Sequence, residues 1–418
     1  MAEIVDVTLD DFSPSGVHEE RFAPSLTGRN FSFRQFGSIA KFCEPVNANN
    51  SIEVVDEIFK KNPNIEAVPI ELDGHVVGTI DRFELRENTN TTWKRLFPRP
   101  CLRCVKICPI VIFAREYIQN LEDAVEEINK EYGIFYFPVF DSSKTFLGTF
   151  SLKEMRLRIR EISDRDFEKA TLQQRNLMPT KDELERLPFR TTIWTKMANK
   201  VGGDLCVIAG LDDKRYIAAS FDVSGKNVAA AMVTMTIGSF FTLAKMLLPD
   251  GLGTAVFVST FDTYLTRMVK TESFVTAVIC FIDIGSKTVE IYNCGHTMMY
   301  VVEGDDAGKV VNVTKYSPSF APLGLGCVAE SIERGDPSHN VLKLNLTGGM
   351  HLGLTSDGFT DMLNSRGVRF EDERVKEFFV NLYSCKDNEV AQKIETAVAG
   401  WIGDTPLPDD ISVMDLRF

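Results

Sequence analysis

The stretch from residue 221 to 226, Phe-Asp-Val-Ser-Gly-Lys, most constrains how this chain can fold, because it joins an apolar run to a long uncharged segment. The run Tyr216–Phe221 predicts a buried strand, and the Ala-rich segment Val228–Leu248 predicts a helix. An aspartate at a strand end followed by a glycine turn leaves a carboxylate and a bare backbone facing one space. Hard divalent cations require such oxygen ligands, from carboxylates, carbonyls or water. The stretch therefore predicts a cation site around Asp222.

The register of a hairpin predicts a second acidic residue beside Asp222. The apolar runs Leu205–Leu211 and Tyr216–Val223 are separated by Asp-Asp-Lys at 212–214, which is a good turn sequence. If the turn is centred there, position 221 or 222 lies opposite 203 or 204. Asp204 and Asp222 are then expected at the same open end of one hairpin.

Two further aspartates stand at the edges of strand-like runs. Asp357 follows the run His351–Ser356, and Asp409 precedes the run Ile411–Phe418. Each is therefore expected at a strand end rather than in the middle of a sheet face. By pattern alone, four acidic residues at four strand ends are equally well explained as solvated turn residues.

Six short motifs in one order carry a resemblance that favours the metal-site interpretation. The motifs are Gly-Gly-Asp (202–204), Asp-Val-Ser-Gly-Lys (222–226), Asn-Cys-Gly-His (293–296), Leu-Gly-Leu (323–325), Thr-Ser-Asp-Gly (355–358) and Asp-Asp-Ile-Ser (409–412). With these motifs, the chain over roughly residues 190–418 resembles the SpoIIE-type branch of the metal-dependent serine/threonine protein phosphatases (the PPM, or PP2C-like, family). The resemblance implies an α+β fold, an α-β-β-α sandwich with helices outside paired sheets.

The resemblance also implies a catalytic site built on two Mn²⁺ or Mg²⁺ ions, between which the sequence does not choose. The carboxylate of Asp222 would bridge the ions, and one ion would also take Asp357 and Asp409. The other ion would use the backbone carbonyl of Gly225 or its neighbour, with Asp204 reached directly or through water. Water held between the ions would attack a phosphoserine or phosphothreonine.

Some assignments stay open at this point. In the Asp409-Asp410 pair the motif register makes the first the ligand, although the register could be one residue off. His296 is a candidate for orienting water or phosphate, but a structural role in a strand turn is the favoured interpretation. Neither Ser224 nor Cys206 has a base at readable spacing, so hydrolysis through a serine or cysteine nucleophile is weakly supported.

Two departures from the family pattern motivate an alternative function. Leu-Cys-Val follows Gly-Gly-Asp at 205–207 where the family usually has an aromatic residue and a second Asp, and Asn227 stands where the family usually has a glycine. The alternative is a catalytically silent ligand-binding signalling module that docks a partner protein. Because Asp222, Asp357 and Asp409 are all present, we expect an active enzyme.

An internal repeat organises residues 46–158. A helical pattern begins at Ser51, and apolar strands surround the turn Asp73-Gly74; the same series begins again at Asn120 and surrounds the turn at 141–143. Helix, strand, tight turn, strand and helix, twice over, resembles a tandem cystathionine-β-synthase (CBS) domain pair, which implies an α/β sensor domain.

The CBS resemblance implies clefts that often bind adenine nucleotides. Ser151 and Glu154 are the residues of this chain expected to hold a nucleotide, and they fit a helix capping box equally well. At the matching place in the first repeat, Asp81 and Glu84, an acid replaces the usual hydroxyl and would repel phosphate.

The segment 150–190 is highly charged and has a narrow apolar stripe, which predicts a long exposed helix. The resemblance implies that this linker couples sensor to catalyst, commonly in a dimer; a solvated spacer is the equal alternative. We therefore predict an N-terminal extension (1–45), a CBS-pair sensor (46–158), a helical linker (159–190) and a SpoIIE-like phosphatase domain (191–418).

Composition excludes several partner classes. The net charge of −13 argues against nucleic acid or an anionic membrane as the main partner. The N-terminus has no secretory signal pattern, so a cytoplasmic location is expected. The uncharged stretch 228–244 is better explained as a buried helix than as a membrane span. By resemblance, the partner is a phosphoprotein substrate, such as an anti-sigma-factor antagonist, and a homodimer is left open.

Three cysteines cluster in the sequence Cys-x2-Cys-x3-Cys-Pro, at Cys101, Cys104 and Cys108. This spacing is typical of a metal or iron–sulfur loop, but a fourth ligand and a nearby histidine are missing. Incidental cysteines under a connecting loop are the favoured interpretation.

Overall fold

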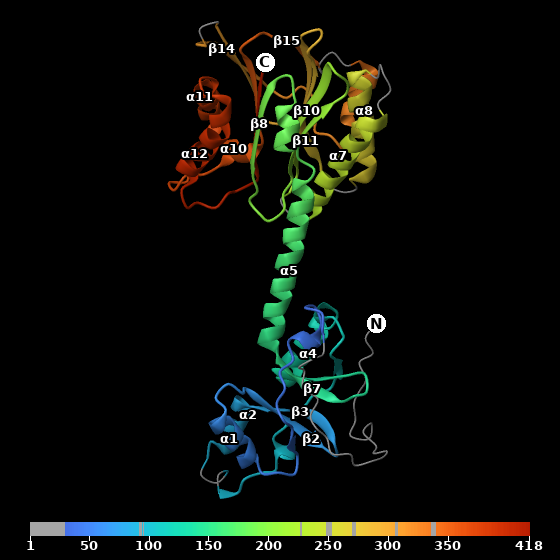
Figure 1. Cartoon of the computed structure of the whole chain (residues 1–418), viewed down its shortest axis with the longest axis vertical. Helices are drawn as coiled ribbons and strands as arrows, with labels where there is room; N and C mark the ends of the chain where they lie inside the picture. The colour runs from blue at the N-terminus through green and yellow to red at the C-terminus, as the bar shows by residue number, and fades with distance from the viewer. Residues whose placement is uncertain are drawn as a thin grey trace. The chain divides into compact units, whose positions relative to one another are not determined.

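The computed structural model describes residues 30–91, 94, 96–225, 228–247, 253–269, 273–305, 308–335 and 340–418. The chain forms two compact units, residues 1–166 and 167–418, and helix α5 (Leu152–Arg175) runs from one into the other (Figure 1).

The first half of the N-terminal unit contains the predicted series of elements. Helix α1 begins after Ser51, whose side chain accepts a hydrogen bond from the backbone N–H of Glu53 and caps the helix. Asp73 and Gly74 have φ values of +49° and +84°, which suits the tight turn between two antiparallel strands. The elements are β1 (Val46–Asn47), α1 (Ile52–Lys61), β2 (Ala67–Leu72), β3 (His75–Asp81), α2 (Arg82–Thr89), η3 (Cys101–Arg103) and β4 (Lys106–Ile107).

The second half repeats this order, as the sequence predicts. In both halves a short strand pairs in parallel with the first strand of an antiparallel hairpin, and a helix follows that hairpin. The two sheets have the strand orders β1-β2-β3-β4 and β5-β6-β7. The elements are β5 (Ile112–Phe113), η4 (Ile118–Asn120), α4 (Glu122–Tyr132), β6 (Tyr136–Phe140), β7 (Phe146–Ser151) and then α5.

The clustered cysteines lie in this unit and are buried. Cys101, Cys104 and Cys108 are 0%, 6% and 7% exposed, and burial raises the pKa of Cys101 to about 11 and that of Cys108 to about 12. Thiols that stay protonated are poor metal ligands. The three side chains lie in the hydrophobic cores of this unit.

The linker is helical over only part of the predicted range. Helix α5 ends at Arg175, and a separate short helix, α6 (Lys181–Glu185), begins after Thr180, which caps it. Pro179 explains the break, because proline disfavours helical geometry at the residue before it and lacks a backbone N–H. The prediction of one long helix over 150–190 is therefore wrong beyond Arg175.

The C-terminal unit contains two five-stranded antiparallel sheets with the orders β15-β12-β11-β10-β9 and β14-β13-β16-β17-β8. Helices α7 and α8 pack on the outer face of the first sheet, and α11 and α12 pack on the outer face of the second (Figure 1). The predicted α-β-β-α sandwich is thus confirmed for this unit. Its strands are β8 (Arg190–Lys196), β9 (Asp204–Gly210), β10 (Arg215–Val223), β11 (Val275–Asp283), β12 (Thr288–Cys294), β13 (Met299–Gly304), β14 (Val310–Tyr316), β15 (Leu342–Asn345), β16 (Met350–Thr355) and β17 (Ile411–Arg417). Its helices after α6 are α7 (Val228–Leu247), α8 (Thr254–Met268), α9 (Cys327–Arg334), α10 (Asp357–Asp361), α11 (Glu371–Tyr383), η5 (Asp387–Glu389) and α12 (Val390–Ile402).

Strand alternation decides which residues face the gap between the two sheets. In β10, Phe221 packs in the core under α7 and α8, whereas Ala218 packs in the core between the sheets. Because side chains alternate along a strand, Asp222 shares the inner face with Ala218. The same argument places Asp204 on the inner face with Cys206. The first sheet therefore delivers both carboxylates to the end of the gap between the sheets.

Helix α7 contains the uncharged stretch 228–244, whose length raised the question of a membrane span. Among the helices of the described ranges, none is both long enough and apolar enough to cross a bilayer.

Candidate functional site

The hairpin prediction is confirmed residue by residue. Asp204 on β9 pairs directly with Asp222 on β10, and on its other side Asp222 pairs with Thr276 on β11. The turn that fixes this register is held by Asp212, whose Oδ1 accepts hydrogen bonds of 2.8 Å from the backbone N–H groups of Lys214 and Arg215. A short turn of fixed length leaves the strands one pairing.

The second sheet brings Asp357 and Asp409 to the same end of the gap. Asp357 is the first residue of α10, directly after β16, and Asp409 lies two residues before the adjacent strand β17. The carboxyl group of Asp222 lies next to that of Asp357. Burial first, and then the negative charges of Asp357, Asp409 and Asp410, raise the pKa of Asp222 to about 7. Asp222 therefore lies close enough to Asp357 and Asp409 for their charges to interact.

Asp410 is buried, and both of its carboxylate oxygens accept hydrogen bonds from backbone N–H groups. It is 2% exposed, its Oδ1 accepts a 2.7 Å hydrogen bond from Ala198 N, and its Oδ2 accepts one of 2.7 Å from Gly203 N. Asp409 is only partly buried, and its Oδ1 accepts from Asp410 N. The geometry favours Asp409 as the ligand of the pair and gives Asp410 the task of fixing the loop before Asp204.

Asp204 is more deeply buried than Asp222. It is 1% exposed, and burial together with the charge of Asp222 raises its pKa well above the ordinary value. The hydroxyls of Ser356 and Ser412 lie nearby and oppose that rise, but Asp204 Oδ2 and Ser412 Oγ have no hydrogen-bond partner among the described residues. An unpaired buried carboxylate oxygen of this kind is what an ordered water or an ion would satisfy.

Glycines bring the backbone close to these carboxylates. A Cβ on Gly203 would lie 2.6 Å from Val223 O and 3.0 Å from Gly225 O, and one on Gly358 would lie 2.0 Å from Asp410 O. Gly225 has a φ of +94°, which only glycine adopts without strain. Side chains at Gly203 and Gly358 would push apart the loops that carry the aspartates.

The donor set fits a divalent cation by its chemistry. Aspartate oxygens and the Gly225 carbonyl are the ligands that Mg²⁺ and Mn²⁺ take. In the part of the chain that the structure describes, no three His, Cys, Asp or Glu side chains are arranged as a complete metal site. Asp222 and Asp357 instead form a pair of neighbouring carboxyl groups. Lys226 and Asn227, the end of the Asp222 motif, lie outside the described residues.

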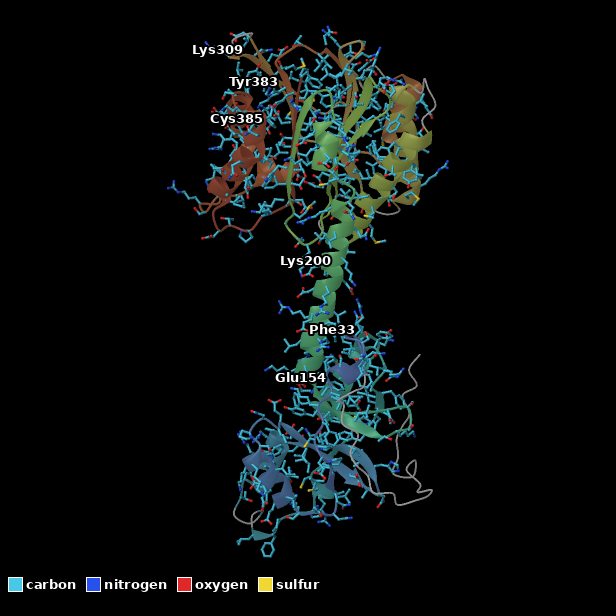
Figure 2. All side chains as sticks on the ribbon, in the orientation of Figure 1. Phe33, Glu154, Lys200, Lys309, Tyr383 and Cys385 are labelled. Atoms are coloured by element: carbon cyan, nitrogen blue, oxygen red, sulfur yellow. The ribbon has the colours of Figure 1, made fainter. Side chains whose placement is uncertain are left out.

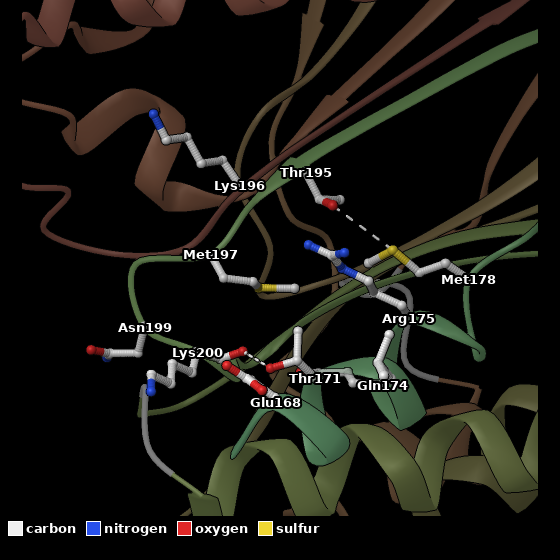
Figure 3. Close-up of a pocket in the computed structure, with 11 residues that line it drawn as sticks. Glu168, Thr171, Gln174, Arg175, Met178, Thr195, Lys196, Met197, Asn199 and Lys200 are labelled. Atoms are coloured by element: carbon white, nitrogen blue, oxygen red, sulfur yellow. Dashed lines mark hydrogen bonds between the residues drawn. The ribbon is translucent and has the colours of Figure 1, made fainter. Parts of the chain in front are cut away.

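Sequence reasoning missed one residue that contacts this site, Gln174 on the last turn of α5. It is 4% exposed; its Nε2 donates to Gly202 O at 2.6 Å and to Thr234 Oγ1 at 2.9 Å, and its Oε1 accepts from Gly202 N at 3.2 Å. Figure 3 shows this part of α5 against the segment that follows β8, where Thr171 donates to Lys200 O. Nothing in the sequence distinguishes Gln174 from its neighbour Gln173, because only the contact gives it a role.

Ser151 and Glu154, predicted to hold a nucleotide, are engaged within the N-terminal unit. Glu154 Oε2 accepts hydrogen bonds of 3.0 Å from both Ser151 N and Ser151 Oγ, and Ser151 Oγ accepts one of 3.1 Å from Glu154 N. Glu154 also forms an ion pair with Lys41 (Figure 2 labels Glu154 at the start of α5). The first repeat has the same arrangement, with a capping box of Asp81 and Glu84 and a 2.8 Å ion pair from Glu84 to Lys106.

Comparisons with known proteins agree with the geometry of the C-terminal unit. Residues 212–418 match the family model described as Stage II sporulation protein E (SpoIIE). Among solved structures, the SiaA-PP2C domain of Pseudomonas aeruginosa is 20% identical, with a TM-score of 0.52 over 62% of this chain and 98% of that one. The PP2C phosphatase domain of SpoIIE from Bacillus subtilis, with a fragment of its regulatory domain, is 18% identical, with a TM-score of 0.44 over 56% of this chain and 64% of that one. No curated protein matches the chain.

At these identities the solved structures establish a fold only, and the SiaA-PP2C domain is the one of the two that is similar enough to do so. The family match covers the strands and loops that carry Asp222, Asp357 and Asp409. Residues 212–418 therefore form a SpoIIE-type phosphatase domain with the PP2C fold.

Proposed function

We propose that the protein is a metal-dependent phosphoserine/phosphothreonine protein phosphatase that acts in bacterial-type signalling. The observation that carries the proposal is the contact between Asp222 and Asp357, with the charge of Asp409 beside them, at the open end of the sandwich. Three like charges placed together destabilise a fold unless a cation neutralises them. The SpoIIE family match over the same residues supports the same activity.

Each residue of the site has a distinct task in this proposal. Asp222, which lies between Asp204 and Asp357, would hold two Mn²⁺ or Mg²⁺ ions together with Asp357, Asp409 and the Gly225 carbonyl. Asp204, sealed behind, orients water at the inner side. When bound, such an ion pair activates water and neutralises phosphoryl oxygens in an in-line displacement.

A covalent nucleophile has no support among the described residues. Burial raises the pKa of the Cys206 thiol to about 12, which leaves it protonated. Ser224 Oγ accepts a 2.9 Å hydrogen bond from Phe274 N and has no histidine beside it to act as a base. In this proposal the nucleophile is therefore water.

For the N-terminal unit we propose a CBS-pair sensor. The repeated order of elements supports it, as does the packing of β3 against β6, where Thr79 Oγ1 donates to Tyr136 O at 3.1 Å. An adenine nucleotide at Ser151 and Glu154 would have to displace Lys41 from Glu154. The proposal thus includes a competition between the ligand and an internal lysine.

We further propose that α5 carries the signal to the catalyst, that the substrate is a small phosphoprotein such as an anti-sigma-factor antagonist, and that the protein works as a homodimer. The bonds of Gln174 to Gly202, two residues before Asp204, support the first of these. A helix that shifts by a fraction of a turn would break those bonds, and the loop that positions Asp204 would loosen.

The test is hydrolysis of p-nitrophenyl phosphate and of a phosphoserine peptide by the full chain with Mn²⁺, Mg²⁺ or EDTA. We expect metal-dependent turnover that falls by at least about a hundredfold in Asp222→Asn and stays unchanged in Asp213→Asn, an exposed turn residue of the same hairpin. Adding adenine nucleotides to the same assay tests the sensor. Binding of Mn²⁺ without turnover on either substrate would favour the silent docking module instead.

A further inference from the structure

The motif Asn-Cys-Gly-His at 293–296 builds a turn that aims an imidazole into the gap between the sheets. Gly295 has a φ of +68°, and a Cβ there would lie 2.7 Å from the ring of Pro322. Asn293 closes the turn, because its Oδ1 accepts a 3.0 Å hydrogen bond from His296 N and its Nδ2 donates one of 2.9 Å to Thr297 O. The glycine and the asparagine thus fix the direction of the histidine.

One side of the imidazole is tied to the strand next to Asp222. His296 is 4% exposed, and its Nδ1 lies 2.9 Å from Thr276 Oγ1. Thr276 is the residue of β11 directly opposite Asp222, and its hydroxyl also lies 3.4 Å from Asp222 O. The ring therefore contacts the end of β10 through a single threonine.

The other side of the imidazole faces the strand that leads to Asp357. The backbone carbonyl of Thr355, at the end of β16, lies on this side, but the imidazole Nε2 has no hydrogen-bond partner among the described residues. Thr297, the next residue after His296, donates its hydroxyl to the same carbonyl. Thr355 stands two residues before Asp357. The ring thus lies between the two strand ends that supply the carboxylates.

The imidazole ring of His296 is uncharged. Burial lowers the pKa of His296 to about 4, so the imidazole carries one N–H and one lone pair at working pH. A leucine or phenylalanine would fill the space without leaving a buried nitrogen unpaired, as Nε2 is here. The imidazole instead makes one directed contact, from Nδ1 to Thr276 Oγ1, and the adjacent Thr297 makes the contact to the Thr355 carbonyl.

We propose that His296 is a positioning residue of the phosphatase site, a strut that is joined to Thr276 through its Nδ1 and to Thr355 through the adjacent Thr297. This strut sets the separation of Asp222 and Asp357 and hence the spacing of the metal ligands. This inference rests on the proposed function. It differs from a role in core packing because it requires the Nδ1 contact to Thr276, and from acid–base catalysis because the ring is buried.

The test uses His296→Leu and His296→Gln in the full chain. Mn²⁺ affinity is measured by calorimetry with the metal alone, and kcat and KM are measured with the phosphoserine peptide. We expect Mn²⁺ affinity to fall by about 10- to 100-fold in both variants, as for other residues that orient metal ligands. We expect kcat to fall in parallel while KM changes less than about threefold. The inference is overturned if His296→Leu keeps the affinity and kcat of the wild type.

His351 offers the matched control. It is also a buried histidine of the sandwich, 8% exposed, and it lies on β16 beside Arg417 and Tyr383 rather than beside the aspartates. His351→Leu is expected to change thermal stability and to leave Mn²⁺ affinity unchanged. Equal losses of Mn²⁺ affinity in both histidine variants would indicate a general packing effect and reject the strut.

A second pair of variants tests the route through Thr276 and does not depend on how well the His296 variants fold. Thr276→Val removes the hydroxyl and is expected to lower Mn²⁺ affinity, whereas Thr276→Ser keeps the hydroxyl and the affinity. Combining Thr276→Val with His296→Gln should cost no more than the worse single change, since both break one connection. Additive losses would reject this route.

Calorimetry also separates the two proposals. A wild type that binds Mn²⁺ but hydrolyses nothing contradicts the proposed function, while an affinity that falls in His296→Gln still supports the strut. Turnover in the wild type with no change in the His296 variants contradicts only the strut.

Discussion

Gln174 holds both backbone groups of Gly202: its amide nitrogen donates to Gly202 O at 2.6 Å, and its amide oxygen accepts from Gly202 N at 3.2 Å. The same amide nitrogen donates to Thr234 on α7. One side chain at the end of α5 is thus bonded both to the loop before Asp204 and to the helix after Gly225. A buried amide with all of these bonds is rigid, and losing it would free both sides of the site together.

Replacing Gln174 by alanine should therefore lower turnover more than stability. We expect kcat to fall by about tenfold or more and the free energy of unfolding to fall by about 1–3 kcal/mol, the cost of leaving the Gly202 groups unpaired. Steady-state kinetics and urea unfolding measure the two. The control is Gln173→Ala on the exposed side of the same turn, which should change neither. Equal kinetics in the two variants would contradict the proposed coupling.

The neighbouring aspartates 409 and 410 should respond in opposite ways to the same substitution. Asp410 accepts from two buried backbone N–H groups, so Asp410→Ala is expected to cost about 2–5 kcal/mol of unfolding free energy. Asp409→Ala removes one of several crowded negative charges and should leave the stability of the metal-free protein unchanged or higher, while lowering Mn²⁺ affinity. Chemical unfolding in EDTA and calorimetry with Mn²⁺ distinguish them. A larger stability loss in Asp409→Ala would show that the ligand register is shifted by one.

The sequence predicts this site well wherever local geometry fixes the register. Asp204 and Asp222 are paired as expected because the turn at 212–214 leaves the two strands no other alignment. By contrast, the inward orientation of Asp410 and the contact of Gln174 depend on which loops approach each other across the sandwich, and no local pattern encodes that approach. The sensor residues show the same limit, because the ion pair of Glu154 with Lys41 joins segments far apart in sequence.

The ring of Phe33 should fix the first turns of α5 to the N-terminal unit. The guanidinium carbons of Arg158 and Arg165 lie 4.1 Å and 3.7 Å from the ring centroid, and Arg158 Nη1 donates to Phe33 O at 2.9 Å (Figure 2 labels Phe33 beside α5). Each cation–π contact contributes about 0.5–2 kcal/mol. We expect Phe33→Ala to speed amide hydrogen exchange over residues 156–166 by about tenfold or more. Phe83→Ala, which removes a side chain that is 65% exposed, is the control and should leave that exchange unchanged. Unaltered amide exchange in Phe33→Ala would show that helix α5 is stable without the Phe33 contacts.

The raised pKa of Asp222 predicts how stability depends on pH without metal. The folded-state pKa is about 7 and the unfolded value is near 3.8, so the unfolded chain loses this proton first as pH rises. The stability that the protonated carboxyl contributes is full below pH 3.8 and is lost as pH rises through 7. Each pKa unit corresponds to about 1.4 kcal/mol, so the wild type should lose about 2–4 kcal/mol relative to Asp222→Asn between pH 4.5 and pH 8.

Urea unfolding in EDTA at several pH values measures this difference, with Asp213→Asn at the exposed turn as the variant that should follow the wild type. Parallel curves for the wild type and Asp222→Asn would show that the carboxylates are farther apart in solution than their contact in the fold implies. Adding Mn²⁺ should cancel the loss, because a cation that favours ionised Asp222 competes with the proton for the same oxygens. Mn²⁺ affinity is therefore expected to rise with pH up to about 7 and to level off above it.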